Sequence, residues 1–469
     1  MRINDAQSRL NDTEVHDIVR PVTADGVVGA VRRAAAEGRP VSVAGGRHAM
    51  GGQQFAQGAL HLDMTGLDRV VSLDEERGLA VVEAGTQWPG LLRQLGDMQA
   101  KPEKLPEAEG KNFRGRWTIR QKQTGVDAVT LGGSVGANIH GRGLRMGPMA
   151  ADVESLELVD AAGELRRCSR SENAELFSLV VGGYGLFGVV VRVTLRLMRR
   201  VWLRRQAESV LIRDVPERIE QRTAEGCLYG DAQFAIDLDG NAAEHRGILS
   251  CYAPTSPPEP RAPPLRTLAA REWAGLYTLA RTSKRAAFDA YTEHYLATDG
   301  QVYPSDTSQL SSAFAGYGEA VDARRGTAVI TEVYVRPDAL LSLLAACRAD
   351  FKAHGVDLVY GTIRFIDPDP DTFLPWARQR LACVVCNLHV EHTEAGLAKA
   401  RDDFRRIIDR AIEHGGHYYL TYHRWARRDQ VLTCYPRLPE FLERKQAYDP
   451  DDRFRSDWLR HTRALLAEE

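Results

Sequence analysis

The sequence carries little net charge and no long apolar run. Its 61 lysines and arginines are opposed by 63 aspartates and glutamates, which gives a formal net charge of −2. This balance argues against a nucleic-acid partner, because nucleic-acid binders present a basic surface. No apolar stretch reaches the roughly 18 residues of a membrane-spanning helix, and the opening MRINDAQSRLNDTEV has no apolar signal-peptide core. We therefore expect a cytoplasmic protein with no membrane span and no nucleic-acid partner.

Cysteine patterns that bind metals are also missing. Cys383 and Cys386 form the only C-x-x-C, within the strand-like run LACVVCNLHV. Alternation along a strand sends these two sulfurs to different faces, and no second pair completes a zinc site. We expect buried structural cysteines and no metal.

What the chain does have is enough length for two domains and clear periodicity. Its 469 residues exceed one ordinary core. Residues 22–37 have helical spacing after a Thr/Asp start, whereas residues 60–83 alternate with period two as strands do. Residues 338–355 and 395–416 are predicted helices that alternate with predicted strands. This alternation favours an α+β second domain around an antiparallel sheet. The strands expected there are residues 327–337, 358–366 and 382–392.

Glycine is concentrated in three turns within the first 200 residues. These are AGGRHAMGGQ at 44–53, TLGGSVGANIHGRG at 130–143 and VVGGYGLFGVVV at 180–191. Each adjoins a predicted strand, and such turns can direct several backbone N–H groups toward phosphate oxygens. None has the strand–GxGxxG–helix context of a Rossmann fingerprint.

In order and spacing these three segments resemble the FAD-binding segments of the vanillyl-alcohol oxidase, or PCMH-type, flavoprotein superfamily. The late YDPDDRFRSDW at 448–458 resembles another signature of that superfamily. The resemblance implies a two-subdomain FAD-binding domain plus an antiparallel-sheet substrate (cap) domain with flanking helices. It divides the chain into residues 1–198 for FAD, 199–417 for substrate, and 418–469 returning to the FAD domain.

The resemblance also assigns cofactor contacts. His48, with Gln53 five positions later, matches the histidine that bonds covalently to flavin in many members; the alternative is a turn histidine that only forms hydrogen bonds. The second segment has no cysteine, so a second covalent bond is not expected. The implied FAD-binding residues are Gly45, Gly46, Arg47, His48, Ala49, Met50, Gln53, Thr130, Gly132, Gly133, Ser134, Gly136, Ala137, Asn138, His140, Gly141, Gly185, Gly188 and Val190.

The stretch NIHGRG resembles the sugar-oxidising branch, which includes alditol oxidases, aldonolactone oxidoreductases and decaprenylphosphoryl-ribose oxidases. That likeness implies oxidation of a CH–OH group of a sugar, amino sugar, polyol or glycoside. Hydride passes to FAD, and oxygen or another acceptor reoxidises it. Arg142 stands where alditol oxidases have a serine, so it is either suited to an anionic group or a solvated loop charge.

Five residues are candidates for the chemistry. Arg364 matches an arginine that alditol oxidases place near substrate, and Asn387 lies on a predicted strand with a polar face. Glu332 interrupts a β-branched strand, where alternation permits either a pocket or a solvated position. A one-residue alignment choice puts Tyr422 or His423 near the flavin. His423 is the preferred base because histidine titrates near neutrality, with Tyr422 as the alternative.

Other functions remain open at this level. One is FAD-dependent reduction of a carbon–carbon double bond, as in the sterol-reductase relatives, although no nicotinamide site is visible. Another is flavin binding without turnover, and a third is binding of a sugar nucleotide without flavin.

Overall fold

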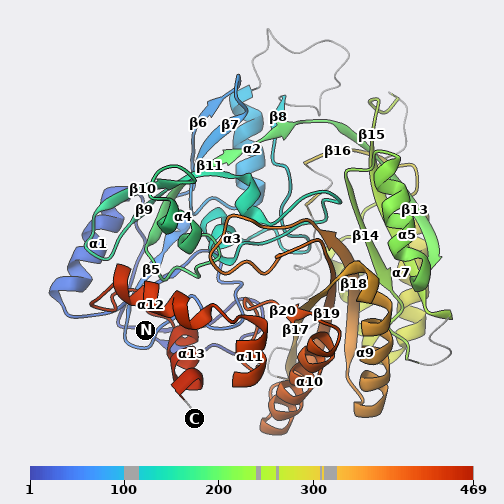
Figure 1. Cartoon of the computed structure of the whole chain (residues 1–469). Helices are drawn as coiled ribbons and strands as arrows, with labels where there is room; N and C mark the ends of the chain where they lie inside the picture. Colours follow the sequence, from blue (N-terminus) through green and yellow to red (C-terminus); the bar gives the residue numbers. More distant parts are fainter. Residues whose placement is uncertain (100–115, 239–243, 260–263, 307–308, 311–324, 468–469) are drawn as a thin grey trace.

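The structure is a computed structural model that describes residues 1–99, 116–238, 244–259, 264–306, 309–310 and 325–467 (Figure 1). Its N-terminal part is built mainly on two sheets, beside the two-stranded pairs of β1 (Arg2–Ile3) with β2 (Thr13–Glu14) and β8 (Trp117–Thr118) with β12 (Met198–Arg199). Strands β3 (Asp17–Val19), β5 (Leu60–Asp63) and β4 (Val41–Ala44) pair in parallel. The second sheet is antiparallel, in the order β10-β9-β11-β7-β6. Its strands are Leu165–Ser169, Val153–Val159, Val189–Arg196, Leu79–Glu83 and Val70–Asp74.

Helix α1 (Ala24–Ala36) packs between these sheets, against β5, β9 and β11. It begins where the Thr23 side chain accepts a hydrogen bond from the Gly26 amide, and it buries Val27 and Val31 against both sheets. This confirms the helix expected at 22–37. Helix α2 spans Trp88–Gln99.

The glycine-rich second segment contains a short helix that sequence reasoning missed. Helix α3 (Leu131–Ala137) begins after Thr130, whose hydroxyl accepts from the Gly133 amide at 3.3 Å. It ends at Asn138, which adopts a left-handed conformation with φ of 49°. A similarly short α4 (Ala174–Val180) precedes the third glycine segment.

The second part is built on an eight-stranded antiparallel sheet in the order β16-β13-β15-β14-β18-β19-β17-β20. Its strands are Val302–Pro304, Trp202–Leu211, Arg246–Thr255, Tyr229–Phe234, Leu358–Ile366, Leu381–Glu391, Gly326–Val335 and His417–Tyr418. Helices α9 (Leu340–His354) and α10 (Glu394–Glu413) pack together, and α10 contacts β17, β19 and β20. Helix α6 (Ala270–Thr282) contacts β18, while α7 (Lys284–Leu296) contacts β13 and β15. Helix α5 spans Val215–Ala224. The α+β class with an antiparallel sheet is confirmed.

The end of the chain returns to the N-terminal part (Figure 1). Helices α11 (Arg428–Cys434), α12 (Leu438–Tyr448) and α13 (Asp457–Ala467) follow β20. Val41 forms a parallel bridge with Phe454, and its amide donates to the Arg453 carbonyl at 2.7 Å. The division at residues 198 and 417 itself stays a prediction.

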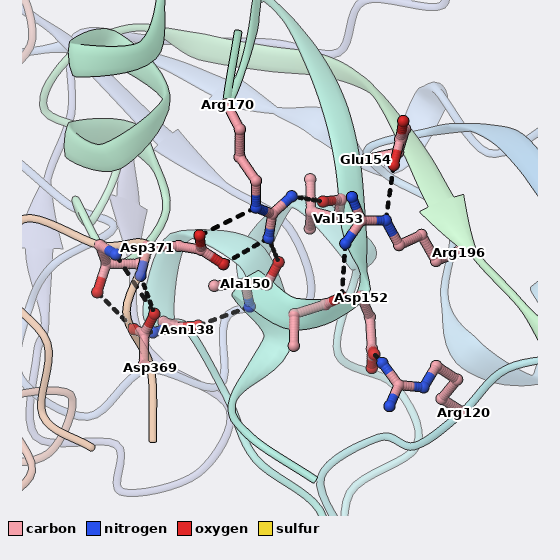
Figure 2. Close-up of polar contacts among 12 residues, drawn as sticks. Arg120, Asn138, Ala150, Asp152, Val153, Glu154, Arg170, Arg196, Asp369 and Asp371 are labelled. Carbon is pink, nitrogen blue, oxygen red and sulfur yellow. Dashed lines mark hydrogen bonds and ion pairs between the residues drawn. The ribbon is translucent and has the colours of Figure 1, made fainter. Parts of the chain in front are cut away.

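A polar network joins the two parts behind the second glycine segment (Figure 2). The Arg170 guanidinium donates to both carboxylate oxygens of Asp371, at 2.9 and 2.5 Å, and to the carbonyls of Ala150 and Val153. Asn138 donates to Asp369 at 2.8 Å. Charge-assisted bonds of this kind are stronger and more directional than neutral ones, so they fix the loop after β18 against the helix α3 region.

Among the described ranges, no helix combines the length and apolarity needed to cross a membrane.

Candidate active site

One large cavity, of about 1030 Å³, connects the glycine segments with the eight-stranded sheet. Most of the residues expected to bind FAD line it, together with four of the five candidates for the chemistry. Those lining residues are Gly45, Gly46, Arg47, His48, Ala49, Met50, Gln53, Thr130, Gly132, Gly133, Gly136, Ala137, His140, Gly185, Gly188, Val190, Glu332, Arg364, Asn387 and Tyr422.

The first two glycine segments touch so closely that only glycine fits. A Cβ added at Gly45 would lie 1.9 Å from Thr130 Oγ1, and one at Gly46 would lie 2.1 Å from the Ala128 carbonyl oxygen. Both distances are far inside van der Waals contact, so these glycines let two backbone segments form one wall of the cavity. A backbone-lined wall of this size fits the expected FAD, whose phosphates need close approach of main-chain N–H groups.

His48 and Gln53 occupy different positions in that wall. Burial lowers the pKa of His48 to about 4, with nearby Asp5 opposing and Arg47 adding to the effect. The imidazole is therefore neutral near pH 7. Gln53 donates to the carbonyls of Leu420 and Thr421 at 3.0 and 3.1 Å and accepts from the Gly51 amide. It ties the first glycine turn to the C-terminal segment beside Tyr422.

Three expected FAD contacts lie behind the cavity wall. The Ser134 hydroxyl donates to the Thr130 carbonyl within α3. Asn138 is held by Asp369, and the Gly141 amide donates to the Gln121 side chain. None of the three lines the cavity; their observed bonds hold the loop, and their contact with the cofactor stays a prediction.

Glu332 is the centre of a buried hydrogen-bond network on the cavity side of β17. Its side chain is 6% exposed, which overturns the solvated alternative. One carboxylate oxygen accepts from Tyr422 at 2.5 Å. The other accepts from Tyr334 at 2.8 Å and meets His140 Nε2 at 2.9 Å. Because the other ring nitrogen of His140 faces the Gly141 carbonyl at 3.0 Å, both nitrogens are placed to donate.

The network sets the charge of Glu332. Burial alone would raise its pKa, but the neighbouring His140 and Arg364 and the hydroxyl of Tyr422 hold it down to about 2. Burial and the adjacent carboxylate raise the pKa of Tyr422 well above its usual value. The pair is therefore a carboxylate and a neutral phenol through the physiological range.

Cys383 lies on the same side of the sheet and donates weakly to Glu332, with a sulfur–oxygen distance of 3.8 Å. His140, Glu332 and Cys383 thus bring three potential metal-binding atoms within 4.8 Å of one another. The hydrogen bonds of His140 and Cys383 to Glu332 account for the short distances between these three atoms. Cys386 is also buried, and burial and the nearby Cys347 of α9 raise the pKa of its thiol. The sulfurs of Cys383 and Cys386 thus have different neighbours, as strand alternation predicts.

Arg364 and Asn387 reach the cavity from β18 and β19. Arg364 is buried and donates to the hydroxyl of Thr124, a residue before the second glycine segment. Sequence reasoning did not select Thr124, because it lies in a stretch with no periodicity or motif.

His423 is outside the cavity lining. Its ring stacks on Trp425 with centroids 4.0 Å apart, and Phe404 of α10 lies edge-on to it. Burial lowers the pKa of His423 to about 3. His423 thus does not reach the cavity, whereas its neighbour Tyr422 lines it, and the identity of the base stays a prediction.

Arg142 is not a solvated loop charge. Its side chain is 12% exposed and stacks over Tyr252, 4.4 Å from the ring centroid. It also donates to the Tyr252 hydroxyl at 3.1 Å.

Comparison with known proteins supports the cofactor. Residues 16–105 match the family described as FAD binding domain. The chain is 28% identical over 248 residues to an uncharacterised oxidoreductase in the fasciation locus of Rhodococcoides fascians, which covers 52% of each protein. It is 25% identical to decaprenylphosphoryl-β-D-ribose oxidase of Mycolicibacterium smegmatis, covering 94% of this chain and 93% of the relative.

A third relative is L-gulono-1,4-lactone dehydrogenase of Mycobacterium tuberculosis, 24% identical over 94% of this chain and 95% of the relative. The matched domain, the glycine-walled cavity and the named activities of these relatives agree on one kind of protein. Residues 16–105 form an FAD-binding domain, the similarities are consistent with the PCMH-type superfamily, and the protein is an FAD-dependent oxidoreductase.

Proposed function

We propose that this oxidoreductase oxidises a CH–OH group of a sugar-like small molecule, a sugar, amino sugar, polyol or glycoside, to a carbonyl. The observation that carries the proposal is the Tyr422–Glu332–His140 network on the cavity wall. Alcohol oxidation needs a group that takes the hydroxyl proton while hydride leaves carbon. Two relatives that align along almost the whole chain are named for a ribose derivative and a sugar lactone, which favours the same substrate class.

The glycine segments around Gly45 and Thr130 would hold the cofactor. When bound, FAD supplies the hydride acceptor. The chain supplies the proton path. Tyr422 Oη, which lines the cavity, accepts the substrate hydroxyl proton as its own proton passes to Glu332 Oε1, 2.5 Å away.

His140 and Arg364 make this path workable. Both favour the anionic carboxylate of Glu332, so the tyrosine always has an acceptor. A carboxylate with a low pKa is a weak base, but an alcohol that is losing hydride becomes strongly acidic, so a weak base suffices. Arg364 also presents a guanidinium at the cavity that suits a substrate oxygen.

We further propose that His48 forms the covalent bond to FAD that its motif implies. A neutral imidazole is the nucleophilic form, and the lowered pKa of His48 keeps it neutral. Its place on the cavity wall beside Gly45 and Gly46 supports this role.

Anaerobic stopped-flow mixing of the FAD-loaded protein with a panel of sugars, polyols, aldonolactones and glycosides tests the proposed oxidation. Loss of the visible flavin absorbance with at least one CH–OH donor is the expected result. Bleaching by NADH or NADPH alone would replace the proposal with double-bond reduction. A flavin that only dithionite bleaches would leave a binding protein without turnover.

A further inference from the structure

The cavity continues beyond the Glu332 network to a wall of arginines and tyrosines. This wall consists of Arg142, Arg205, Tyr252, Tyr295 and Tyr303, which we call the arginine–tyrosine wall. Arg205 and Tyr252 are paired across β13 and β15, and Tyr295 reaches over from α7. All five line the same cavity as the glycine segments, so a molecule held at the flavin can extend to them.

Arg205 is buried among neutral groups. It is 7% exposed, and its guanidinium donates to the Ser250 hydroxyl at 2.9 and 3.3 Å. The same group stacks 4.0 Å from the ring centroid of Tyr295 and 5.5 Å from that of Tyr252. Within the described part of the chain no carboxylate forms an ion pair with Arg205; burial lowers its pKa, and the surrounding tyrosines, Tyr252 and Tyr295 first, raise it. A guanidinium buried without a counter-charge is costly, so its retention needs a reason.

Arg142 adds a second charge to the same wall. It stacks on Tyr252, the same ring that lies 5.5 Å from Arg205, and forms an ion pair with Asp231 at 3.9 Å. Two guanidinium groups therefore line the cavity on either side of one tyrosine pair. His294, also in the lining, adds no charge near neutrality, because burial and Arg205 lower its pKa.

Two guanidinium groups that flank tyrosine rings form a receptor for an oxyanion. Each guanidinium presents parallel N–H donors that match two oxygens of a carboxylate or phosphate. We propose that the arginine–tyrosine wall binds an oxyanionic group of the substrate, a carboxylate or phosphate, and so makes this enzyme prefer acidic or phosphorylated sugars to neutral ones. This inference rests on the proposed function, since it specifies the substrate class of that site.

Anion binding can be measured without turnover. Isothermal calorimetry on the FAD-loaded protein, with inorganic phosphate and then a simple carboxylate as probes, gives the dissociation constant of each. Arg205→Met should weaken phosphate binding by about tenfold to a hundredfold, the effect of losing hydrogen bonds to a charged group. Arg204→Met is the matched control: Arg204 is the preceding residue on β13 and is exposed, so phosphate binding should not change.

Arg205→Lys protects the test against a folding defect in Arg205→Met. The lysine keeps the charge but loses the forked donors, so binding should fall by an intermediate factor while the flavin spectrum is unchanged. Equal phosphate affinity in the wild type, Arg205→Met and Arg205→Lys proteins would overturn the proposal, as would the absence of any phosphate or carboxylate binding.

Stopped-flow rates with matched sets separate this inference from the proposed function. Each set contains a neutral sugar, its uronic acid and its phosphate ester, which also tells a carboxylate site from a phosphate site. Faster bleaching by either acidic member, reduced in Arg205→Met, is expected. Bleaching by the neutral sugar alone would overturn the anion site and leave the oxidation standing. Anion binding that depends on Arg205, without bleaching by any donor, would support the anion site and overturn the proposed oxidation.

Discussion

The Tyr422 hydroxyl donates to Glu332 Oε1 at 2.5 Å, although the two residues are 90 positions apart in the chain. Tyr422 belongs to the C-terminal segment that returns from β20, and Glu332 to the middle of β17. The proposed active site is thus assembled only when the end of the chain packs against the eight-stranded sheet. Gln53 fixes this arrangement by bonding the carbonyls of Leu420 and Thr421 just before Tyr422.

Removing the Tyr422 hydroxyl should slow the chemical step without loss of cofactor. In Tyr422→Phe the substrate proton loses its path to Glu332, and a positioned acid–base group contributes about 10²- to 10⁴-fold. The rate constant of flavin bleaching should fall by that order, with the flavin content unchanged. Tyr448→Phe is the matched control, since that hydroxyl bonds Glu175 at the surface. An unchanged bleaching rate in Tyr422→Phe would remove the tyrosine from the mechanism.

Glu332 should give the fold a pH-dependent stability. Its pKa is lowered from 4.5 to about 2 in the folded protein, so the folded state holds this proton less tightly than the unfolded chain. The stabilisation is therefore complete above about pH 5 and declines as the pH falls toward 2. Its full size is on the order of 3 kcal/mol.

Urea unfolding of the wild type and Glu332→Gln between pH 7 and pH 3.5 measures this contribution. The difference in unfolding free energy between the two proteins should shrink as the pH falls. Glu76→Gln, at an exposed position, should follow the wild type throughout. A constant difference across the range would mean that Glu332 is not held ionised by the fold.

Periodicity predicted helix α1, helices α9 and α10 and the strands between them, and glycine spacing predicted the three cavity-lining turns. They could not decide the faces of β17, because both faces of that strand are covered and its residues are buried almost without interruption. The sequence therefore left Glu332 open between a pocket and solvent. The choice between Tyr422 and His423 could not be settled from the sequence for a related reason. One residue separates a side chain in the cavity from one stacked on Trp425, and only the path of the returning chain decides it.

The two adjacent arginines of β13 could not be told apart from the sequence either. Arg204 is exposed, whereas Arg205 is buried and lines the cavity. From the sequence, two adjacent arginines are expected to be solvated, because charged residues are rarely buried. Only the pairing of Arg205 with Tyr252 and its stacking on Tyr295 of helix α7 place the second arginine in the cavity lining.

The covalent bond proposed for His48 predicts where flavin goes on acid precipitation. Yellow colour should stay with the precipitated wild-type protein, whereas His48→Ala should release it into the supernatant. His16→Ala, at an exposed position of the same N-terminal part, is the control and should keep its colour in the pellet. Wild-type colour in the supernatant would leave FAD bound but not covalently attached.

His423 should matter to stability but not to the reaction. His423→Gln removes the stacking on Trp425, which is worth about 1 kcal/mol for a ring pair of this kind. The pH profile and the rate constant of flavin bleaching should stay within about twofold of the wild type, because His423 does not line the cavity. A lost or shifted ionisation in the profile of His423→Gln would restore it as the base.

Gly45 should be intolerant of even one methyl group. In Gly45→Ala the new Cβ would lie 1.9 Å from Thr130 Oγ1, and two further Thr130 atoms lie within 2.8 Å. The two glycine segments must then separate, which we expect to cost about 1–3 kcal/mol of unfolding free energy and to lower the FAD content.

Gly29→Ala is the matched control. Gly29 is in α1 with nothing within 4 Å of the added Cβ, so alanine there should stabilise the protein by up to about 1 kcal/mol. Thermal unfolding and the ratio of flavin to protein absorbance measure both effects. Normal flavin content in Gly45→Ala would show that the close approach of the two segments is not what holds the cofactor.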